Sequence, residues 1–299
     1  MSKIEDALKK AKQKNVKAPV SNVTSIADVK ANDLSDVKNK QNIAVTAKEN
    51  PADIVSHKSS AKEIAKMKQD EVFESNVLNE LRIITSTKDD DKLANTYRDL
   101  RTKLLQSSNG ENFIAMVTSV SDGDYSSNCL LNLAAAFSFD ESKTSLIIDC
   151  NINKPRLNKM LSLGELPGIT DYLEDEKIDV NSIVHKSGIK RLRLIPAGTQ
   201  RETATEYFTS LRMRNLTSGL LQRYTDRFIF IDSSPIIDSA DTRILSELCD
   251  FVILVVPYGH ATTNKIKEAT DAIGKEKLLG VIFSEVPRLP SIKSLFSKS

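Results

Sequence analysis

Short runs of hydrophobic residues alternate with helical stretches from residue 112 onward. The apolar runs cover residues 113–118, 145–149, 193–195, 228–232, 251–256 and 280–283. Nearly continuous apolar runs separated by helices are typical of parallel strands that are covered on both faces. We therefore expect an α/β fold with a mostly parallel, doubly wound sheet and helices on both faces. Ligands of such sheets bind beyond the carboxyl ends of the strands, so the loops that follow the strands are the candidate binding loops.

The first 70 residues have a different pattern. They contain no aromatic residue and no glycine, and they are rich in Lys, Asp, Asn and Ser, so they can bury little apolar area. We expect a largely disordered tail with short helices. Near its start, Ser2 and Glu5 match a capping box ahead of an amphipathic stretch. This first helix is either a fraying end or a peptide that docks on a partner or a membrane surface.

Composition excludes several classes of function. The 42 Lys and Arg residues nearly balance the 40 Asp and Glu residues, which argues against a nucleic-acid partner. The three cysteines, Cys129, Cys150 and Cys249, lie in or beside apolar runs without metal-ligand spacing, so we expect reduced core residues. No window approaches the ~20 apolar residues of a membrane span, and the N-terminus lacks a signal-peptide core. We expect a cytoplasmic protein.

Residues 117–128, VTSVSDGDYSSN, have the layout of a phosphate-binding loop between a strand and a helix. Such a loop needs glycines to turn its backbone N–H groups toward the phosphates, a lysine for the outer phosphates, and Ser or Thr for Mg²⁺. Gly123, Ser126 and Ser127 remain as candidate nucleotide-binding residues. However, Ser126 stands where the lysine is expected, so we expect a degenerate loop whose nucleotide binding is weak or absent.

Three further positions in this loop oppose a phosphate group. Tyr125 stands where a second glycine is expected, and Asp122 and Asp124 add carboxylates beside the pocket. Exchanging the attraction of a lysine for the repulsion of these carboxylates is expected to weaken phosphate binding by several kcal/mol.

Two aspartates end expected strands, Asp149 in LIIDCNINKPRL and Asp232 in FIFIDSSPIIDSAD. Aspartates at such strand ends either hold Mg²⁺ and position groups in phosphoryl transfer, or cap the turn that follows. We expect vestigial or weak catalytic residues here, which would join Ser127 as Mg²⁺ ligands only if a nucleotide binds.

Several stretches together resemble the bacterial tyrosine kinase family of P-loop autokinases. They are TYRDLRTKLL, VTSVSDGDYSSN, LIIDCNINKPRL, LPGITDYL, RLIPAG, RMRNLTSGLLQRYTDRFIFIDSSP and DFVILVVPYGHATTNKIKEA, in order over residues 90–286. The opening MSKIEDALKKA is similar to the branch found with exosortase-associated exopolysaccharide loci. The resemblance implies a P-loop NTPase-like domain over residues 111–286, preceded by a disordered tail (1–70) and a helical lead-in (71–110), and followed by a flexible tail (287–299).

The chain departs from the family pattern at several positions. Asp149 and Asp232 match the Walker A′ and Walker B aspartates, but the second acidic and the basic residue of the A′ motif are Asn151 and Asn153. The oligomerisation motif Glu-x-x-Arg-x-x-Arg is represented by Asn95, Arg98 and Arg101, and therefore lacks its acidic member. Family members also carry a C-terminal tyrosine cluster for autophosphorylation, whereas Tyr258 is the last tyrosine of this chain.

These departures favour a catalytically deficient member, a pseudokinase that acts as a regulatory or scaffold subunit in exopolysaccharide (capsule) biosynthesis and export. This interpretation implies no cofactor. A first alternative is an active tyrosine autokinase that uses Mg·ATP, with Lys154 reaching the phosphates from a neighbouring loop. A second alternative is an ATPase of the plasmid-partitioning and cell-division-site type.

The resemblance also implies partners. They are a membrane-embedded polysaccharide co-polymerase, an intact tyrosine kinase paralogue, or both, in homo- or hetero-oligomers and without nucleic acid. We expect the protein to lie in the cytoplasm, peripheral to the inner membrane through its partner.

Overall fold

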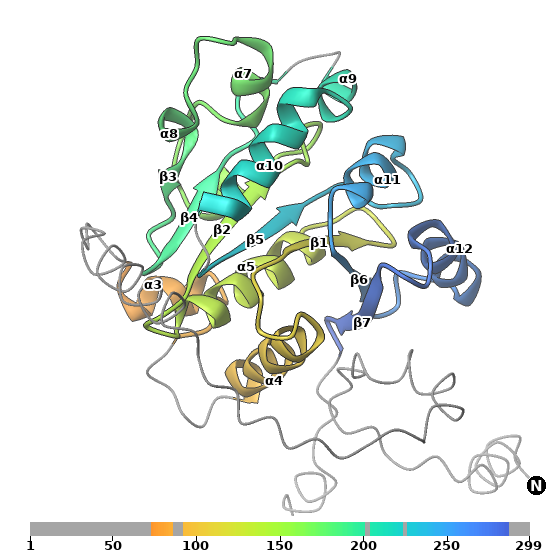
Figure 1. Ribbon diagram of the computed structural model, residues 1–299. Helices are drawn as coiled ribbons and strands as arrows, with labels where there is room; N and C mark the ends of the chain where they lie inside the picture. Colours follow the sequence, from red (N-terminus) through yellow and green to blue (C-terminus); the bar gives the residue numbers. More distant parts are fainter. Residues whose placement is uncertain (1–72, 86–91, 201–203, 224–225, 287–299) are drawn as a thin grey trace, which may run out of the picture.

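The computed structural model describes residues 73–85, 92–200, 204–223 and 226–286. Within them the strands form one seven-stranded sheet in the order β3-β4-β2-β5-β1-β6-β7 (Figure 1). All neighbouring strands pair in parallel except β3, which is antiparallel to β4 at the edge. The strands are β1 Ile114–Ser119, β2 Thr144–Asp149, β3 His185–Lys186, β4 Leu192–Ile195, β5 Arg227–Asp232, β6 Phe251–Pro257 and β7 Leu278–Ser284.

Helices cover both faces of this sheet, as the alternating pattern predicts. One face carries α3 Ser75–Glu80, α4 Lys92–Ser107, α5 Tyr125–Ser138 and α6 Leu157–Met160. The other carries α7 Ile169–Glu174, α8 Val180–Ile183, α9 Ala204–Phe208, α10 Leu211–Arg223, α11 Ala240–Glu247 and α12 Thr263–Ile273. The doubly wound, mostly parallel fold is confirmed.

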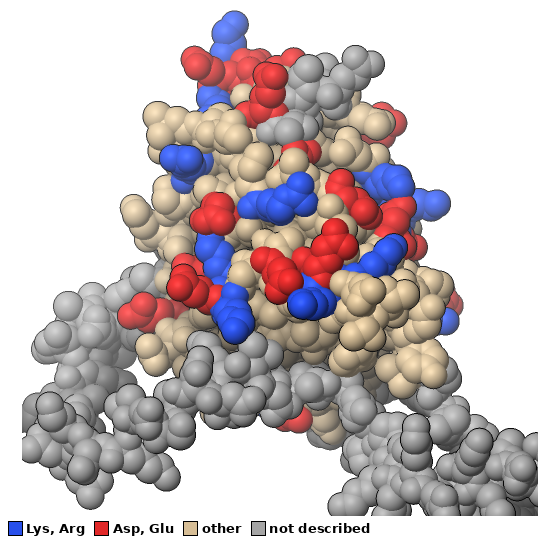
Figure 2. All heavy atoms as spheres, turned by 90° about the vertical axis from the view of Figure 1, so that its right-hand side faces the viewer, with Lys and Arg blue, Asp and Glu red and all other residues tan. Residues whose placement is uncertain are grey.

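Charged side chains of both signs are interspersed on the side of the molecule that lies on the right in Figure 1, where α11 and α12 are. Figure 2 shows blue and red side chains next to each other there, without a broad area of one sign. This distribution agrees with the near balance of charges in the sequence.

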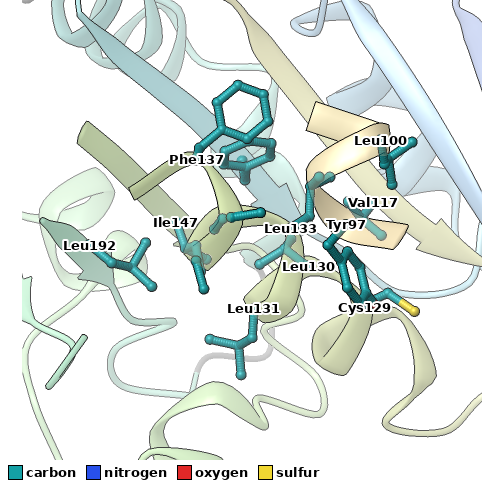
Figure 3. Close-up of a cluster of buried hydrophobic side chains, with 14 of the residues drawn as sticks. Tyr97, Leu100, Val117, Cys129, Leu130, Leu131, Leu133, Phe137, Ile147 and Leu192 are labelled. Carbon is teal, nitrogen blue, oxygen red and sulfur yellow. The ribbon is translucent and has the colours of Figure 1, made fainter. Parts of the chain in front are cut away.

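Helix α5 is the central helix of the fold because it lies between the sheet and α4. Twelve of its fourteen residues are buried, which explains why its sequence is apolar on all sides rather than on one stripe. Leu130, Leu133 and Phe137 lie in one cluster with residues of β1 and β2 (Figure 3). Tyr97 and Leu100 of α4 join the same cluster and extend it away from the sheet.

The segment before the sheet is part of this core. Asn132, fully buried on α5, accepts a hydrogen bond from the backbone N–H of Ile84 at 2.8 Å and donates one to the carbonyl oxygen of Arg82 at 3.2 Å. A buried amide with both of its groups bonded fixes the extended backbone around it. Of the helical lead-in expected over 71–110, the structure describes α3 and α4, with a turn and a non-helical segment over residues 81–85 after α3. The amphipathic helix expected at the start of the chain lies outside the described residues.

Candidate functional site

The predicted phosphate loop joins β1 to α5 and lies beside the carboxyl ends of β2 and β5. Asp149 and Asp232 end these two neighbouring strands and are directly paired in the sheet register. The Oγ of Ser127, in the first turn of α5, donates a hydrogen bond of 2.6 Å to Oδ2 of Asp232. The structure therefore brings together Ser127, Asp149 and Asp232, the three residues that the sequence assigns to one site.

Both aspartates are fully buried, and burial sets their protonation. Loss of hydration raises the pKa of Asp149 to about 6. Burial, followed by the adjacent charge of Asp149, raises the pKa of Asp232 well above its ordinary value. Hydrogen bonds from backbone N–H groups, including that of Asn151 at 3.1 Å, partly offset the shift at Asp149. Asp149 therefore caps the turn after β2, as one of the two predicted roles requires.

Among the described residues, one oxygen of each aspartate has no hydrogen-bond partner. These atoms are Oδ2 of Asp149 and Oδ1 of Asp232. Buried carboxylate oxygens are nearly always paired or bound to a cation, and two of them on adjacent strands are of the kind that Mg²⁺ prefers. These two carboxylates thus fit the metal role as well as the capping role.

The loop itself is held by cations of the chain. Arg156 donates from Nη2 to Oδ1 of Asp122 at 2.8 Å and from Nη1 to Oδ1 of Asp124, and Lys154 is paired with Oδ2 of Asp122. The side chain of Arg156 is only 20% exposed, whereas that of Asp124 is 71% exposed. These contacts hold the pKa of Asp122 below its ordinary value, chiefly through the Lys154 hydrogen bond.

This ion-pair bridge corrects the electrostatic expectation for the loop. The sequence suggests two unpaired carboxylates that repel a phosphate, but both are neutralised by Lys154 and Arg156. In the active-kinase alternative, Lys154 is expected to reach the phosphates of ATP. In the structure, the ammonium group of Lys154 instead contacts the carboxylate of Asp122. The sequence shows four charged residues in these two loops, but their spacing does not predict that the side chains are in contact.

Tyr125 covers the glycine of the loop. A Cβ atom at Gly123, which has φ of +150°, would overlap the ring of Tyr125. The Tyr125 hydroxyl lies 3.5 Å from Nε2 of His260, and the two ring centroids are 5.5 Å apart. The aromatic ring thus connects the phosphate loop to the loop after β6. The sequence alone does not indicate this contact between Tyr125 and His260.

The remaining predicted site positions have structural contacts. Ser126 is buried, and the amide oxygen of Asn151 accepts a hydrogen bond of 2.8 Å from Ser234. Thus Asn151 still connects the β2 and β5 loops, although it lacks the charge of the expected carboxylate.

The predicted oligomerisation motif lies on α4, away from the phosphate loop. Arg98 donates to the amide oxygen of Asn95 at 2.9 Å, and Arg101 donates to the carbonyl oxygen of Ala136 at 2.8 Å. Arg101 therefore contacts the C-terminal turn of α5, where a cation is favourable to the helix dipole. Contacts of this motif between chains stay a prediction.

The described residues include no helix that is both long and apolar enough to cross a membrane. Their three cysteines are buried and unbridged, as predicted.

No profile of a known protein family matches the chain. Individual proteins do. The chain is 30% identical over 191 residues to the tyrosine-protein kinase YwqD of Bacillus subtilis, covering 63% of this chain and 79% of that protein. It is 27% identical over 192 residues to the tyrosine-protein kinase CpsD of Streptococcus agalactiae, covering 64% and 81%. The solved kinase domain of the Escherichia coli tyrosine kinase ETK has the same fold, with a TM-score of 0.63 over 74% of this chain and 90% of that domain at 20% identity.

Proposed function

Because the chain belongs to the bacterial tyrosine-protein kinase family, we propose that it is a catalytically deficient member that acts as a regulatory or scaffold subunit in exopolysaccharide biosynthesis and export. The two relatives compared above are named as tyrosine-protein kinases. The connection to polysaccharide export comes from the family resemblance of the motifs. Its partners would be a membrane-embedded co-polymerase, an intact kinase paralogue, or both.

The proposed catalytic deficiency is supported by one observation, the ion-pair bridge between Asp122, Asp124, Lys154 and Arg156. In a working loop, a lysine and the helix N-terminus offer uncompensated positive charge to the phosphates. Here the loop contains no lysine, and the two nearby cations are already neutralised by two carboxylates of the same loop. The charge that the four side chains present to a triphosphate is therefore close to zero.

The Lys154–Asp122 pair of the bridge is exposed on both sides and is therefore not a barrier to a nucleotide. Exposed ion pairs contribute about 0.2–1 kcal/mol each. A nucleotide that separated Lys154 and Arg156 from the loop would, however, leave Asp122 and Asp124 as unpaired carboxylates beside its phosphates. Either arrangement removes the net attraction that a phosphate loop normally supplies.

A second candidate function is favoured by a different observation. The unpartnered oxygens of Asp149 and Asp232 fit a divalent cation, with Ser127 as a neighbouring hydroxyl ligand. A bound Mg²⁺ would neutralise phosphate charge during phosphoryl transfer. The protein would then contribute by holding the carboxylates of Asp149 and Asp232 side by side. This candidate is an active ATP-dependent autokinase.

Calorimetric titration of Mg·ATP into the full chain separates the two candidates. We expect no binding at millimolar nucleotide for the unaltered protein. The Asp122→Asn/Asp124→Asn variant frees Lys154 and Arg156 and should bind measurably. A matched control, Glu111→Gln/Glu141→Gln, removes two charges before β1 and β2, at the opposite ends of these strands, and should behave like the unaltered protein. Submillimolar binding by the unaltered protein would favour the autokinase.

A further inference from the structure

The chain before the sheet packs on α5 as one segment, residues 73–85, which we call the strap. It consists of α3, the two residues before it, and the turn and non-helical stretch after it. Residues 1–72 directly precede the strap in the sequence. A partner that holds this tail is therefore joined to the domain through the strap.

The strap begins with an anchor on the turn between β3 and β4. The backbone N–H of Phe73 donates a hydrogen bond of 2.8 Å to the carbonyl oxygen of Gly188. The ring of Phe73 lies against the same glycine, because a Cβ atom at Gly188 would be 2.3 Å from the ring. Gly188 also has a φ of +78°. Both the close approach and the left-handed backbone require a glycine at this position.

Backbone hydrogen bonds make the strap a rigid unit. The N–H of Leu78 donates to the carbonyl oxygen of Glu74 at 3.2 Å, and the N–H of Ile83 donates to that of Leu78 at 2.8 Å. The side chains of Ile83 and Ile84 are each 3% exposed and belong to the apolar cluster around α5. Because the bonded segment continues from Glu74 to Ile83, a displacement at Phe73 is carried to the stretch that packs on α5.

Asn132 connects this stretch to the first turn of α5. Its amide accepts the N–H of Ile84 at 2.8 Å and donates to the carbonyl oxygen of Arg82 at 3.2 Å. The same amide nitrogen donates to the carbonyl oxygen of Asn128 at 3.0 Å and lies 3.2 Å from its Oδ1. Asn128 directly follows Ser127, the hydroxyl residue of the candidate metal site. Since Asn132 is fully buried, a lost partner would leave its amide unsatisfied.

The geometry points to the strap as a coupling device between the N-terminal tail and the phosphate loop, with Asn132 as its positioning residue. Displacement of the strap would break the bonds of Asn132 to Arg82 and Ile84 and loosen the turn that holds Ser127. Coupling between two sites is reciprocal, so an ion or nucleotide at the loop would also change the affinity of the tail for its partner. The device is independent of the proposed loss of nucleotide binding, because none of its contacts involves Asp122, Tyr125 or Ser126.

Hydrogen exchange of the full chain, measured by mass spectrometry, tests the coupling. In the Gly188→Ala variant the new methyl group overlaps the ring of Phe73. Phe73→Pro releases the same anchor in another way, because it removes both the ring and the donating N–H. We expect the amides of residues 126–132 to exchange roughly tenfold faster in both variants, together with those of the strap.

Gly274→Ala is the matched control. Gly274 has a φ of +82°, and a Cβ atom there would meet no described atom within 4 Å. It caps α12, which packs on the other face of the sheet. This variant therefore has the same backbone strain as Gly188→Ala without the contact to Phe73, and should leave the exchange of residues 126–132 unchanged.

An Asn132→Ala background shows whether the effect passes through the amide. There Gly188→Ala should still accelerate exchange in the strap, but no longer in residues 126–129. The two comparisons above stand without this background.

Three results would overturn the proposal. Unchanged exchange over residues 126–132 in both Gly188→Ala and Phe73→Pro would show that the strap only covers α5. An equal increase in Gly274→Ala would indicate a general loss of stability. An effect that persists in the Asn132→Ala background would show that Asn132 is not the connection.

Discussion

Asp149 and Asp232 are two adjacent carboxyl groups whose burial opposes their ionisation. Burial raises the pKa of Asp149 to about 6, from about 3.8 in an unfolded chain. Ionised at neutral pH, this group therefore lowers the free energy of unfolding. A buried charge that lowers the free energy of unfolding is typical of a residue that is retained for binding rather than for stability.

Asp149→Asn should raise the free energy of unfolding at pH 7.5 by up to about 3 kcal/mol, because it removes a buried charge whose pKa burial raises to about 6. Both states of the unaltered protein are ionised above pH 6, so the cost of the buried charge is complete there. It falls as the pH drops through 6 and is absent below the unfolded pKa. Urea denaturation at pH 7.5 and 4.5 measures the difference between variant and parent, which should shrink at the lower pH. A difference that does not change with pH would contradict this account.

Ser127→Ala should destabilise the protein by about 1–3 kcal/mol, because it removes the hydrogen bond to Oδ2 of buried Asp232. Ser126→Ala is the control, since Ser126 is a buried neighbour in the same helical turn. Urea denaturation of both variants at pH 7.5 gives the comparison. Equal destabilisation by the two substitutions would show that the hydrogen bond from Ser127 to Asp232 adds nothing measurable to the free energy of unfolding.

At the scale of elements, two glycines show how the same change has opposite effects. Gly168 precedes α7, and a Cβ atom there would overlap the carbonyl oxygen of Pro196 and the backbone nitrogen of Gly198. Gly219 lies inside α10, where a Cβ atom would meet nothing within 4 Å. The first glycine is required by the close approach of two loops, and the second is not.

Gly168→Ala should therefore destabilise the protein by about 1–3 kcal/mol through overpacking against backbone that cannot move freely. Gly219→Ala should stabilise it by about 0.5–1 kcal/mol, because alanine has the higher helix propensity. Thermal unfolding of the two variants tests both signs at once. Stabilisation by Gly168→Ala would show that the loop contact is not rigid.

Six of the seven described strands could be predicted from apolar runs, each to within about two residues. The exception is β3, because its two residues, His185 and Lys186, are polar and owe their conformation to pairing with β4. Likewise, strand-end spacing predicts that Asp149 and Asp232 meet. It does not predict the pairing of Asp122 with Lys154, because residues 32 positions apart in irregular loops carry no periodic signal.

In the molecule as a whole, the fold is intact, whereas the charges at the phosphate loop cancel, because Lys154 and Arg156 pair with its carboxylates. The apolar clusters on both faces of the sheet depend on none of the substituted loop residues except Tyr125, which packs at the edge of one cluster. The proposed loss of nucleotide binding is therefore compatible with an intact fold.

Removal of residues 1–15, which lie outside the described residues, should weaken capture of the membrane-embedded co-polymerase and leave thermal unfolding of the domain unchanged. The expectation rests on the amphipathic pattern of this segment. A pull-down with the truncated and complete chains, with unfolding measured on the same samples, tests it. Unchanged capture would place the docking surface elsewhere, for example on α4.

We propose that substitution in the phosphate loop, and not loss of the fold, removes nucleotide binding. The most direct test is calorimetric titration of Mg·ATP into the unaltered full chain and into its Tyr125→Gly/Ser126→Lys variant, which restores the glycine and the lysine of the loop. We predict no binding at millimolar nucleotide for the unaltered chain and measurable, Mg²⁺-dependent binding for the variant. Tight binding by the unaltered chain would contradict the claim.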